Sequence, residues 1–316
     1  MKTSNQPSHW YILGAGAIGC LWGAHLRLAG HRVTLLLKNR TVLDTFRQRP
    51  IIELTDAVQV RTVKVDAELS QTSAPLHNLL VCTKSVDVME ALASVAQRIT
   101  TTTRIVLLIN GLGVQQEVAA RYPNTEPICG TTTDGAFRTG QFQVTHAGIG
   151  TTYFGLLSDT DDGQRSKDEL LRDLTGLALT VDWDPRIIRR LWSKLAVNCV
   201  INPLTAIRGC RNGAILEPDS APYIKQLCVE IEQVLTALQL AQPEQSLYDQ
   251  VTAVALATRD NYSSMYQDVQ AGRATEIESI TGYLCRQAEQ LGIAVPLNLS
   301  LYDAVKRTTE NQVTGL

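Results

Sequence analysis

The sequence predicts an α/β domain with a doubly wound parallel sheet of the Rossmann type, followed by an all-α C-terminal domain. Short apolar runs alternate with helical segments in the first half of the chain, and a glycine-rich turn follows the first run. In the second half the apolar spacing is helical almost throughout. The 316 residues suffice for about two domains, and we place the boundary at Asp184-Pro185, which gives residues 1–183 and 184–316.

The composition excludes several classes of protein. Lys and Arg number 29 against 31 Asp and Glu, a net charge of −2, which argues against nucleic acid as the main partner. We find neither a secretory signal nor an apolar stretch long enough for a membrane span, and we expect a cytoplasmic protein. The seven cysteines form no CxxC pair, so we expect reduced thiols and no metal site.

The elements of the first half alternate as a parallel sheet requires. We predict buried strands and intervening helices, with the strands at Trp10–Leu13, Arg32–Leu37, Asn78–Cys82 and Arg104–Ile109 and the helices at Cys20–Leu28 and Val86–Gln97. After Pro127 the sequence becomes rich in β-formers and glycine. We expect a hairpin that extends the sheet, with Ile128–Phe137 and Gln141–Phe154 joined by a turn near Thr139-Gly140, then a helix at 162–177 and a strand at Leu179–Trp183.

The glycine-rich turn is Gly14-Ala15-Gly16-Ala17-Ile18-Gly19, and it opens the first helix. Gly14 allows the tight exit from the strand, Gly16 lets the backbone approach a pyrophosphate, and Gly19 lets the helix pack on the strand. The unpaired N–H groups at the helix start would hold the pyrophosphate. The motif alone is weak, but its strand–turn–helix–strand context favours a dinucleotide over a tight turn without a ligand.

The end of the second strand favours NADP(H) over NAD(H). NAD-binding domains usually carry an acid about 20 residues after the glycine turn, where it holds the ribose 2′-OH. Here the strand ends in Lys38-Asn39-Arg40, and the first acid after the turn is Asp44. Two cations suit a 2′-phosphate; the alternative is that they only cap a solvated loop.

Two further loops follow predicted strands and carry Lys84 and Asn110. Ligands of open α/β sheets bind at the carboxyl ends of the strands, which places both residues near the cofactor or the substrate. On position alone, either one could equally be an ordinary surface group.

The second half is predicted to be helical, and a cleft between two such domains is a common ligand site. Glycines and prolines separate candidate helices at 187–207, 218–239, 243–260, 273–291 and 297–309. Lys194 begins a stretch without another charge until Arg208, and Asn198 and Asn202 follow it at helical spacing. Pro203 predicts a kink or break at Asn202.

This Lys–Asn–Asn stripe would be costly in an apolar core and is suited to a wet cleft. Partial burial would lower the pKa of Lys194 and prepare it to give up a proton. The alternative is that Lys194 extends to solvent while the asparagines bind neighbouring loops.

The chain resembles the ketopantoate reductases (2-dehydropantoate 2-reductases) along residues 10–308. The resemblance rests on GAGAIG at 14–19, on KLAVNCVINPLTA at 194–206 and on SSMYQD…TEI at 263–277. It implies reduction of 2-dehydropantoate to pantoate with NADPH, which becomes NADP+, in pantothenate and coenzyme A biosynthesis. It implies a small-molecule partner, with the protein a monomer or a homodimer.

Carried over residue by residue, the resemblance implies that Lys194 is the catalytic proton donor. It implies that Asn198 and Asn202 orient the substrate, that Asn212 is a third polar contact and that Ser264 holds the substrate carboxylate. Glu276 is implied to lie by the reacting oxygen and the cofactor. The other implied contacts are Lys84 and Asn110 near the nicotinamide and ribose, the backbone of Ala136 on the cofactor, and Lys38 with Arg40 at the 2′-phosphate.

The sequence departs from the family pattern at two positions. Asp134 stands where a His or another residue is common, and Lys38 stands where an Arg is common. A lysine keeps the charge but lacks the bidentate fork of arginine, which predicts a weaker preference for NADPH.

Two alternatives stay open beside a ketopantoate reductase. A related enzyme would reduce another branched 2-oxo acid, and assays with ketopantoate distinguish it. A nucleotide-binding sensor would bind NADPH without turnover on any 2-oxo acid.

Overall fold

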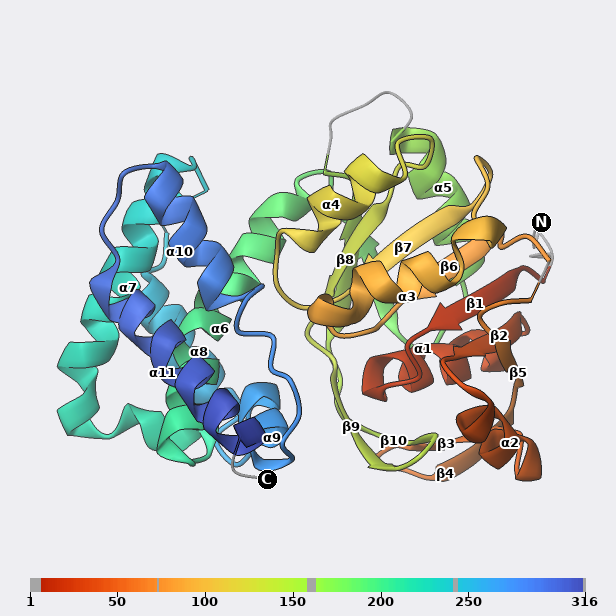
Figure 1. Ribbon diagram of the computed structural model, residues 1–316, viewed down its shortest axis with the longest axis horizontal. Coiled ribbons are helices and arrows are strands. Elements are labelled where there is room, and N and C mark those ends of the chain that lie inside the picture. The colour runs from red at the N-terminus through yellow and green to blue at the C-terminus, as the bar shows by residue number, and fades with distance from the viewer. Residues whose placement is uncertain (1–6, 73, 158–162, 241–243, 315–316) are drawn as a thin grey trace. The chain divides into compact units, whose positions relative to one another are not determined.

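The computed structural model describes residues 7–72, 74–157, 163–240 and 244–314 (Figure 1). Contacts within the chain divide it into two compact units. The first comprises Met1–Ile109 with Val114–Ile188, and the second comprises Asn110–Gly113 with Arg189–Leu316. The short segment Asn110–Gly113 therefore belongs to the helical unit although it follows a strand of the sheet unit.

The main sheet of the first unit confirms the predicted α/β class. Its order is β12-β11-β8-β7-β6-β1-β2-β5. The strands from β5 to β8 are parallel, and β11 runs antiparallel to β8. Their bounds are β1 His9–Leu13, β2 Arg32–Leu37, β5 Asp66–Leu69, β6 Asn78–Val81, β7 Arg104–Leu108, β8 Ile128–Thr132, β11 Thr151–Gly155 and β12 Thr180–Trp183.

The register of these strands places the candidate cofactor loops at one edge of the sheet. Leu13 at the end of β1 pairs with Leu36 of β2 and with Val81 of β6, and Val81 pairs with Leu107 of β7. Parallel strands end at the same edge, so the loops that follow β1, β2, β6 and β7 begin side by side. Open α/β sheets bind ligands at this edge, where the strand order reverses.

One predicted helix of the first unit is shorter in the structure. The predicted helix at 86–97 is a one-turn 3₁₀ segment, then α3, then another 3₁₀ segment. The bounds in this unit are α1 Ala17–Leu28, α2 Arg40–Gln48, η1 Ser85–Asp87, α3 Val88–Ser94, η2 Ala96–Arg98, α4 Val114–Arg121 and α5 Gly163–Leu174. The start of the predicted helix at 162–177 lies outside the described residues.

A second sheet, of order β4-β3-β10-β9, corrects the predicted hairpin. The turn lies near Gly140 as expected, but its strands β9 and β10 join β3 and β4 instead of extending the main sheet. Each of the two predicted strands is divided in the structure. The first becomes β8 and β9 and the second becomes β10 and β11, and β8 and β11 pair with each other in the main sheet. The bounds are β3 Ile51–Thr55, β4 Val60–Lys64, β9 Gly135–Gly140 and β10 Gln143–Gly148.

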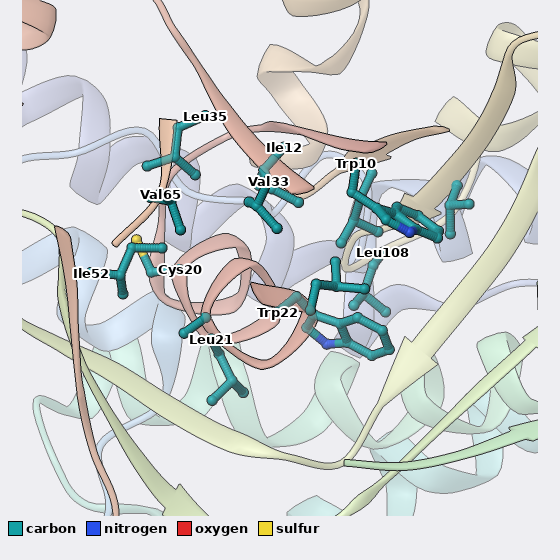
Figure 2. Packing of buried hydrophobic residues seen from close by; sticks show 14 of the residues in the cluster. Trp10, Ile12, Cys20, Leu21, Trp22, Val33, Leu35, Ile52, Val65 and Leu108 are labelled. Carbon is teal, nitrogen blue, oxygen red and sulfur yellow. The ribbon is translucent and has the colours of Figure 1, made fainter. Parts of the chain in front are cut away.

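Helix α1 is buried between the two sheets of this unit. It contacts β1 and β2 of the main sheet and β3, β9 and β10 of the second sheet. Its residues from Gly19 to Leu26 are all buried, as expected for a helix covered on every side. Figure 2 shows Trp22 of α1 on the side of Trp10 of β1 and Leu108 of β7, whereas Leu21 points to the other side of the helix.

The second unit is helical, as predicted (Figure 1). Helices α7, α10 and α11 contact one another. The bounds are α6 Ile187–Arg208, η3 Asn212–Leu216, η4 Pro218–Ser220, α7 Ala221–Ala237, α8 Leu247–Ala257, α9 Ser264–Gln270, α10 Thr281–Gln290 and α11 Pro296–Thr314. The predicted start of a helix at residue 243 lies outside the described residues.

Two predictions in this half are wrong. The helix predicted at 273–291 begins only at Thr281, because residues 273–280 form a bend and turns, and α9 was not predicted. Of the kink or break predicted at Asn202, the break does not occur in the described chain, since α6 continues through Pro203 to Arg208. Leu204 and Ala206 beyond the proline are buried, and this packing outweighs the local cost of about 3 kcal/mol.

All seven cysteines are free in this structure. In the described part of the chain, no helix is both long and apolar enough to cross a membrane. Nor do the described residues bring together three His, Cys, Asp or Glu side chains in an arrangement that could hold a metal ion.

Candidate active site

The glycine turn has the close contacts that its sequence predicts. Gly14 adopts φ +103°, and a Cβ there would lie 2.6 Å from the backbone N of Thr83. A Cβ on Gly19 would lie 2.0 Å from the carbonyl O of Gly14, so only glycine allows the helix to start this close to the strand. A Cβ on Gly16 would meet no heavy atom of the described chain within 4 Å.

The start of α1 is open to an anion. Gly16 is the N-cap residue and offers no side chain to the free N–H groups of the first turn. That turn, which contains Ala17 and Ile18, has no acidic residue. The positive end of the helix dipole is therefore uncompensated by the helix's own side chains, as pyrophosphate binding requires.

The loop after β6 touches this turn through its backbone. Cys82 donates its N–H to the carbonyl of Leu13 at 2.8 Å. Lys84 follows two residues later and is partly buried at the start of η1. The structure thus places Lys84 in a loop next to the glycine turn, as the strand order predicted.

Lys38 and Arg40 flank the N-cap of α2 and are both exposed. Between them, Asn39 accepts a hydrogen bond from the N–H of Val42 at 2.9 Å, which fixes the start of the helix. The two cations follow directly after the end of β2, which is the neighbour of β1 in the sheet. Their position suits recognition of a phosphate on a ribose beside the glycine turn.

Ala136 lies in the second sheet, near the start of β9. It packs against the same hydrophobic cluster as Ala15, Ala17 and Ile18 of the glycine turn. The backbone that was expected to touch the cofactor is therefore held next to α1.

In the second unit, the loop Asn110–Gly113 is anchored to the segment before α10. Leu112 donates its N–H to the carbonyl of Ser279 at 2.8 Å. Gly111 has φ +80°, and a Cβ there would lie 2.6 Å from that same carbonyl oxygen. This contact presents Asn110, whose Nδ2 donates to Glu276 Oε2 at 3.3 Å.

In the helical unit, Lys194 lies close enough to Glu276 to feel the charge of its carboxylate. Glu276 is 8% exposed, and Lys194 is partly buried on α6. Burial lowers the pKa of Lys194 to about 8, because removal from water disfavours the ammonium, while the negative charge of Glu276 opposes that shift. The structure therefore brings together Lys194, Glu276 and Asn110, a grouping that no local pattern predicts.

The remaining predicted substrate residues extend along α6 and the loops beside it. Asn198 is partly buried and Asn202 is buried, one and two turns beyond Lys194 on neighbouring faces of the helix. Near Asn202, Thr205 Oγ1 lies 2.7 Å from the hydroxyl of Ser263, the N-cap residue of α9. Ser264 follows as the exposed first residue of α9.

Asn212 is tied to the loop that leads to Ser264. Its N–H donates to the carbonyl of Asn261 at 2.9 Å, and its Nδ2 donates to Thr258 Oγ1 at 2.9 Å. Its Oδ1 is buried and accepts no hydrogen bond from the described residues. An acceptor left unpaired in this way is available to a substrate hydroxyl.

Sequence reasoning missed the residues that hold these groups in place. Ser279 supports the loop of Asn110, and Ser263, not Ser264, caps α9. The pair of glycines in Asn110-Gly111-Leu112-Gly113 was the one signal available. Gly113 also adopts a positive φ, and a Cβ on it would touch the ring of Tyr283.

Comparison with known proteins identifies the family. The protein-family model described as ketopantoate reductase PanE/ApbA matches residues 10–159. The family model of the ketopantoate reductase C-terminal part matches residues 186–309. A 2-dehydropantoate 2-reductase of Vibrio cholerae serotype O1 is 35% identical over 296 residues, which cover 93% of this chain and 96% of the relative. The chain belongs to the ketopantoate reductase family. It is therefore an oxidoreductase that works with a nicotinamide dinucleotide.

Solved structures share the fold of this family member. A PanE/ApbA family ketopantoate reductase from Ralstonia eutropha JMP134 has a TM-score of 0.85 at 23% identity, covering 96% of this chain and 99% of that one. D-mandelate dehydrogenase with NADH and anilino(oxo)acetate has a TM-score of 0.88 at 21% identity, with coverages of 96% and 99%. The open side of Gly16 and the uncapped start of α1 fit the dinucleotide that the family uses.

The opposing effects of burial and Glu276 give a prediction for the titration of Lys194. In a Glu276→Gln variant only burial remains, so the pKa of Lys194 should fall below about 8. Trace acylation with acetic anhydride at a series of pH values, read by peptide mass spectrometry, reports the free amine at Lys194.

Glu278→Gln is the matched control. Glu278 lies 3.1 Å from Lys306 Nζ and accepts a hydrogen bond from Tyr302, so its loss should leave the titration of Lys194 unchanged. Equal curves for Lys194 in both variants would contradict the coupling to Glu276.

Proposed function

We propose that this chain reduces 2-dehydropantoate to pantoate with NADPH, in the cytoplasm, as a step of pantothenate and coenzyme A biosynthesis. The observation that carries the proposal is the grouping of Lys194, Glu276 and Asn110. An amine with a pKa of about 8 is well matched to proton transfer near neutral pH. The relatives at 35% identity bear the name of this reaction.

Lys194 is the proton donor in this proposal. When bound, the reduced nicotinamide supplies a hydride to C2 of the 2-oxo acid. The ammonium of Lys194 stabilises the charge that develops on the C2 oxygen and delivers a proton to it. Below pH 8 the amine is mostly protonated before each turnover, because its pKa is about 8.

Glu276 and Asn110 prepare Lys194 for this step. The carboxylate of Glu276 favours the ammonium over the neutral amine, which offsets part of the effect of burial. Asn110 holds that carboxylate through its amide group. We also assign Asn110 and Lys84 to the nicotinamide and ribose, because both follow strands at the ligand-binding edge of the sheet.

The polar side chains beyond Lys194 on α6 orient the substrate. Asn198 and Asn202 offer amide donors and acceptors to the C2 oxygen and the hydroxyl of 2-dehydropantoate. Asn212 offers its unpaired Oδ1, and Ser264 offers a hydroxyl to the substrate carboxylate. Fixing C2 in this way supplies the proximity part of catalysis.

The residues of the first unit hold the cofactor. The glycine turn Gly14-Ala15-Gly16-Ala17-Ile18-Gly19 binds the pyrophosphate, the backbone of Ala136 completes the cradle, and Lys38 with Arg40 binds the 2′-phosphate.

The proton-donor role predicts the kinetics of Lys194→Ala. This variant should fold and bind NADPH nearly as the wild type does, while turnover falls by about 10² to 10⁴. Steady-state rates and fluorescence titration of NADPH measure the two effects. Lys225→Ala is the control, because this lysine lies over the ring of Tyr248, on helices other than α6. Turnover of Lys194→Ala within about threefold of the wild type would refute the role.

The assignment of the 2′-phosphate predicts a selective loss of affinity. The double variant Lys38→Ala with Arg40→Ala should bind NADPH about 10-fold or more weakly and should bind NADH as before. Dissociation constants for both nucleotides test this. Arg47→Ala removes a charge from the last turn of the same helix α2 and should leave both constants unchanged. An equal loss for the two nucleotides in the double variant would show that these cations do not recognise the 2′-phosphate.

A panel of 2-oxo acids tests the substrate. With NADPH, kcat/KM should be highest for 2-dehydropantoate and fall about 10-fold or more for analogues that lack its hydroxyl, because the polar side chains on α6 would lose a partner. A higher value for another branched 2-oxo acid would assign that reaction instead. NADPH binding without turnover on any member would assign a sensor.

A further inference from the structure

A buried carboxylate in the first unit joins the two sheets. The side chain of Asp134 is 1% exposed and lies in the turn between β8 and β9. Its Oδ1 accepts from His146 Nε2 at 2.8 Å and from the N–H of Gly150 at 3.0 Å. Its Oδ2 accepts from the hydroxyls of Thr132 at 2.8 Å and Thr152 at 3.4 Å.

These partners come from both sheets. Thr132 and Thr152 belong to β8 and β11 of the main sheet, whereas His146 belongs to β10 of the second sheet. Glycine makes the arrangement possible, because a Cβ on Gly150 would lie 2.4 Å from the backbone N of Asp134. Asp134 therefore fixes the position of β9 and β10 of the second sheet relative to β8 and β11 of the main sheet.

The pair also acts on the strand that carries Ala136. His146 is the direct cross-strand partner of Ala136 in the β9–β10 ladder. An irregularity follows between His146 and Gly148, where the ladder shifts register. At such a bulge the ladder alone does not define the strand, and a side-chain contact can set its position.

Helix α1 lies on the other side of His146. The ring of His25 on α1 lies 6.0 Å from the ring of His146, edge to face. Burial lowers the pKa of His25 to about 4, so His25 is neutral near pH 7 and presents an uncharged ring to its neighbour. The contact therefore links β10 to the helix that begins at the glycine turn.

We propose that the Asp134–His146 pair is a positioning device for the dinucleotide, holding the backbone of Ala136 in register with the glycine turn at the start of α1. The inference rests on the proposed role of Ala136 in cofactor binding. It also explains the departure at Asp134, because the aspartate supplies acceptors for a histidine and two threonines that lie around it.

The energetics favour positioning over stability as the reason for the pair. A buried ionisable pair commonly stabilises a protein no better than well-packed apolar residues of similar volume. Its hydrogen bonds instead restrict the geometry, here to one relation between β8, β10 and β11. Loss of the pair should therefore change ligand affinity more than an apolar substitution of equal effect on Tm.

The test measures nucleotide binding without substrate. His146→Leu replaces the imidazole with an apolar side chain that donates no hydrogen bond. It should weaken the binding of NADPH and of NADH alike by about 10-fold. The loss should be equal because the pair acts on Ala136 and not on the 2′-phosphate. At saturating NADPH, kcat should stay within about twofold, since Lys194 is untouched. His146→Gln restores a donor and should recover most of the affinity.

Val63→Ala is the control for stability. Val63 is buried in β4, at the other edge of the second sheet, so its truncation should lower Tm while leaving both affinities unchanged. If His146→Leu does not fold, Asp134→Asn serves instead, because it keeps the volume but loses the charge and one acceptor.

Wild-type affinity in folded His146→Leu, or an equal loss in Val63→Ala, would overturn the inference. The outcome is separate from that of the proposed function. A wild-type protein that bound NADPH without reducing 2-dehydropantoate would end the proposed function, and the binding constants of the variants would still decide the role of the pair.

Discussion

The site depends on one costly arrangement, a lysine ammonium held partly out of water on a helix segment that carries no other charge until Arg208. Burial alone would drive Lys194 toward its neutral form, which could not act as the proposed proton donor. Glu276 supplies the opposite charge that moderates this effect, and the result is a pKa of about 8. In the proposed function, the polar residues beyond Lys194 on α6 orient the substrate toward this amine.

The rest of the architecture serves to hold groups in place around that lysine and around the cofactor. In the helical unit, the left-handed Gly111 lets the backbone approach Ser279, and Asn110 then reaches Glu276. In the sheet unit, Gly14 and Gly19 let α1 begin directly at the end of β1. Asp134 and His146 join the two sheets behind Ala136. In each case, a glycine allows two segments of backbone to approach each other.

The sequence predicted the parts of the fold that are encoded locally. The strands Arg32–Leu37 and Asn78–Val81 are mostly apolar, as expected of parallel strands that are buried on both faces. The second sheet was missed, since β3 pairs with β10 about ninety residues later and no local pattern marks that partner. At Pro203 a correct local rule failed, because tertiary packing kept α6 helical.

The candidate site follows the same division. The stripe from Lys194 to Asn202 is a helical period that can be seen in one segment. Asn110 and Glu276 are 166 residues apart. The place of Asn110 after a predicted strand suggested that it lies near a ligand, but only the family resemblance suggested the same of Glu276. The contacts of Asp134 were also beyond local reasoning, because its partners come from three strands of two sheets.

Chemical rescue tests the role of Lys194 most directly. Small primary amines would be added to a Lys194→Ala variant, saturated with NADPH and substrate, and turnover would be followed against the concentration of the protonated amine. If Lys194 is the proton donor, turnover rises with that concentration, and amines small enough for the space left by the lysine side chain are the most effective. Turnover that is independent of every amine, while NADPH and substrate still bind, would contradict a proton donor at this position.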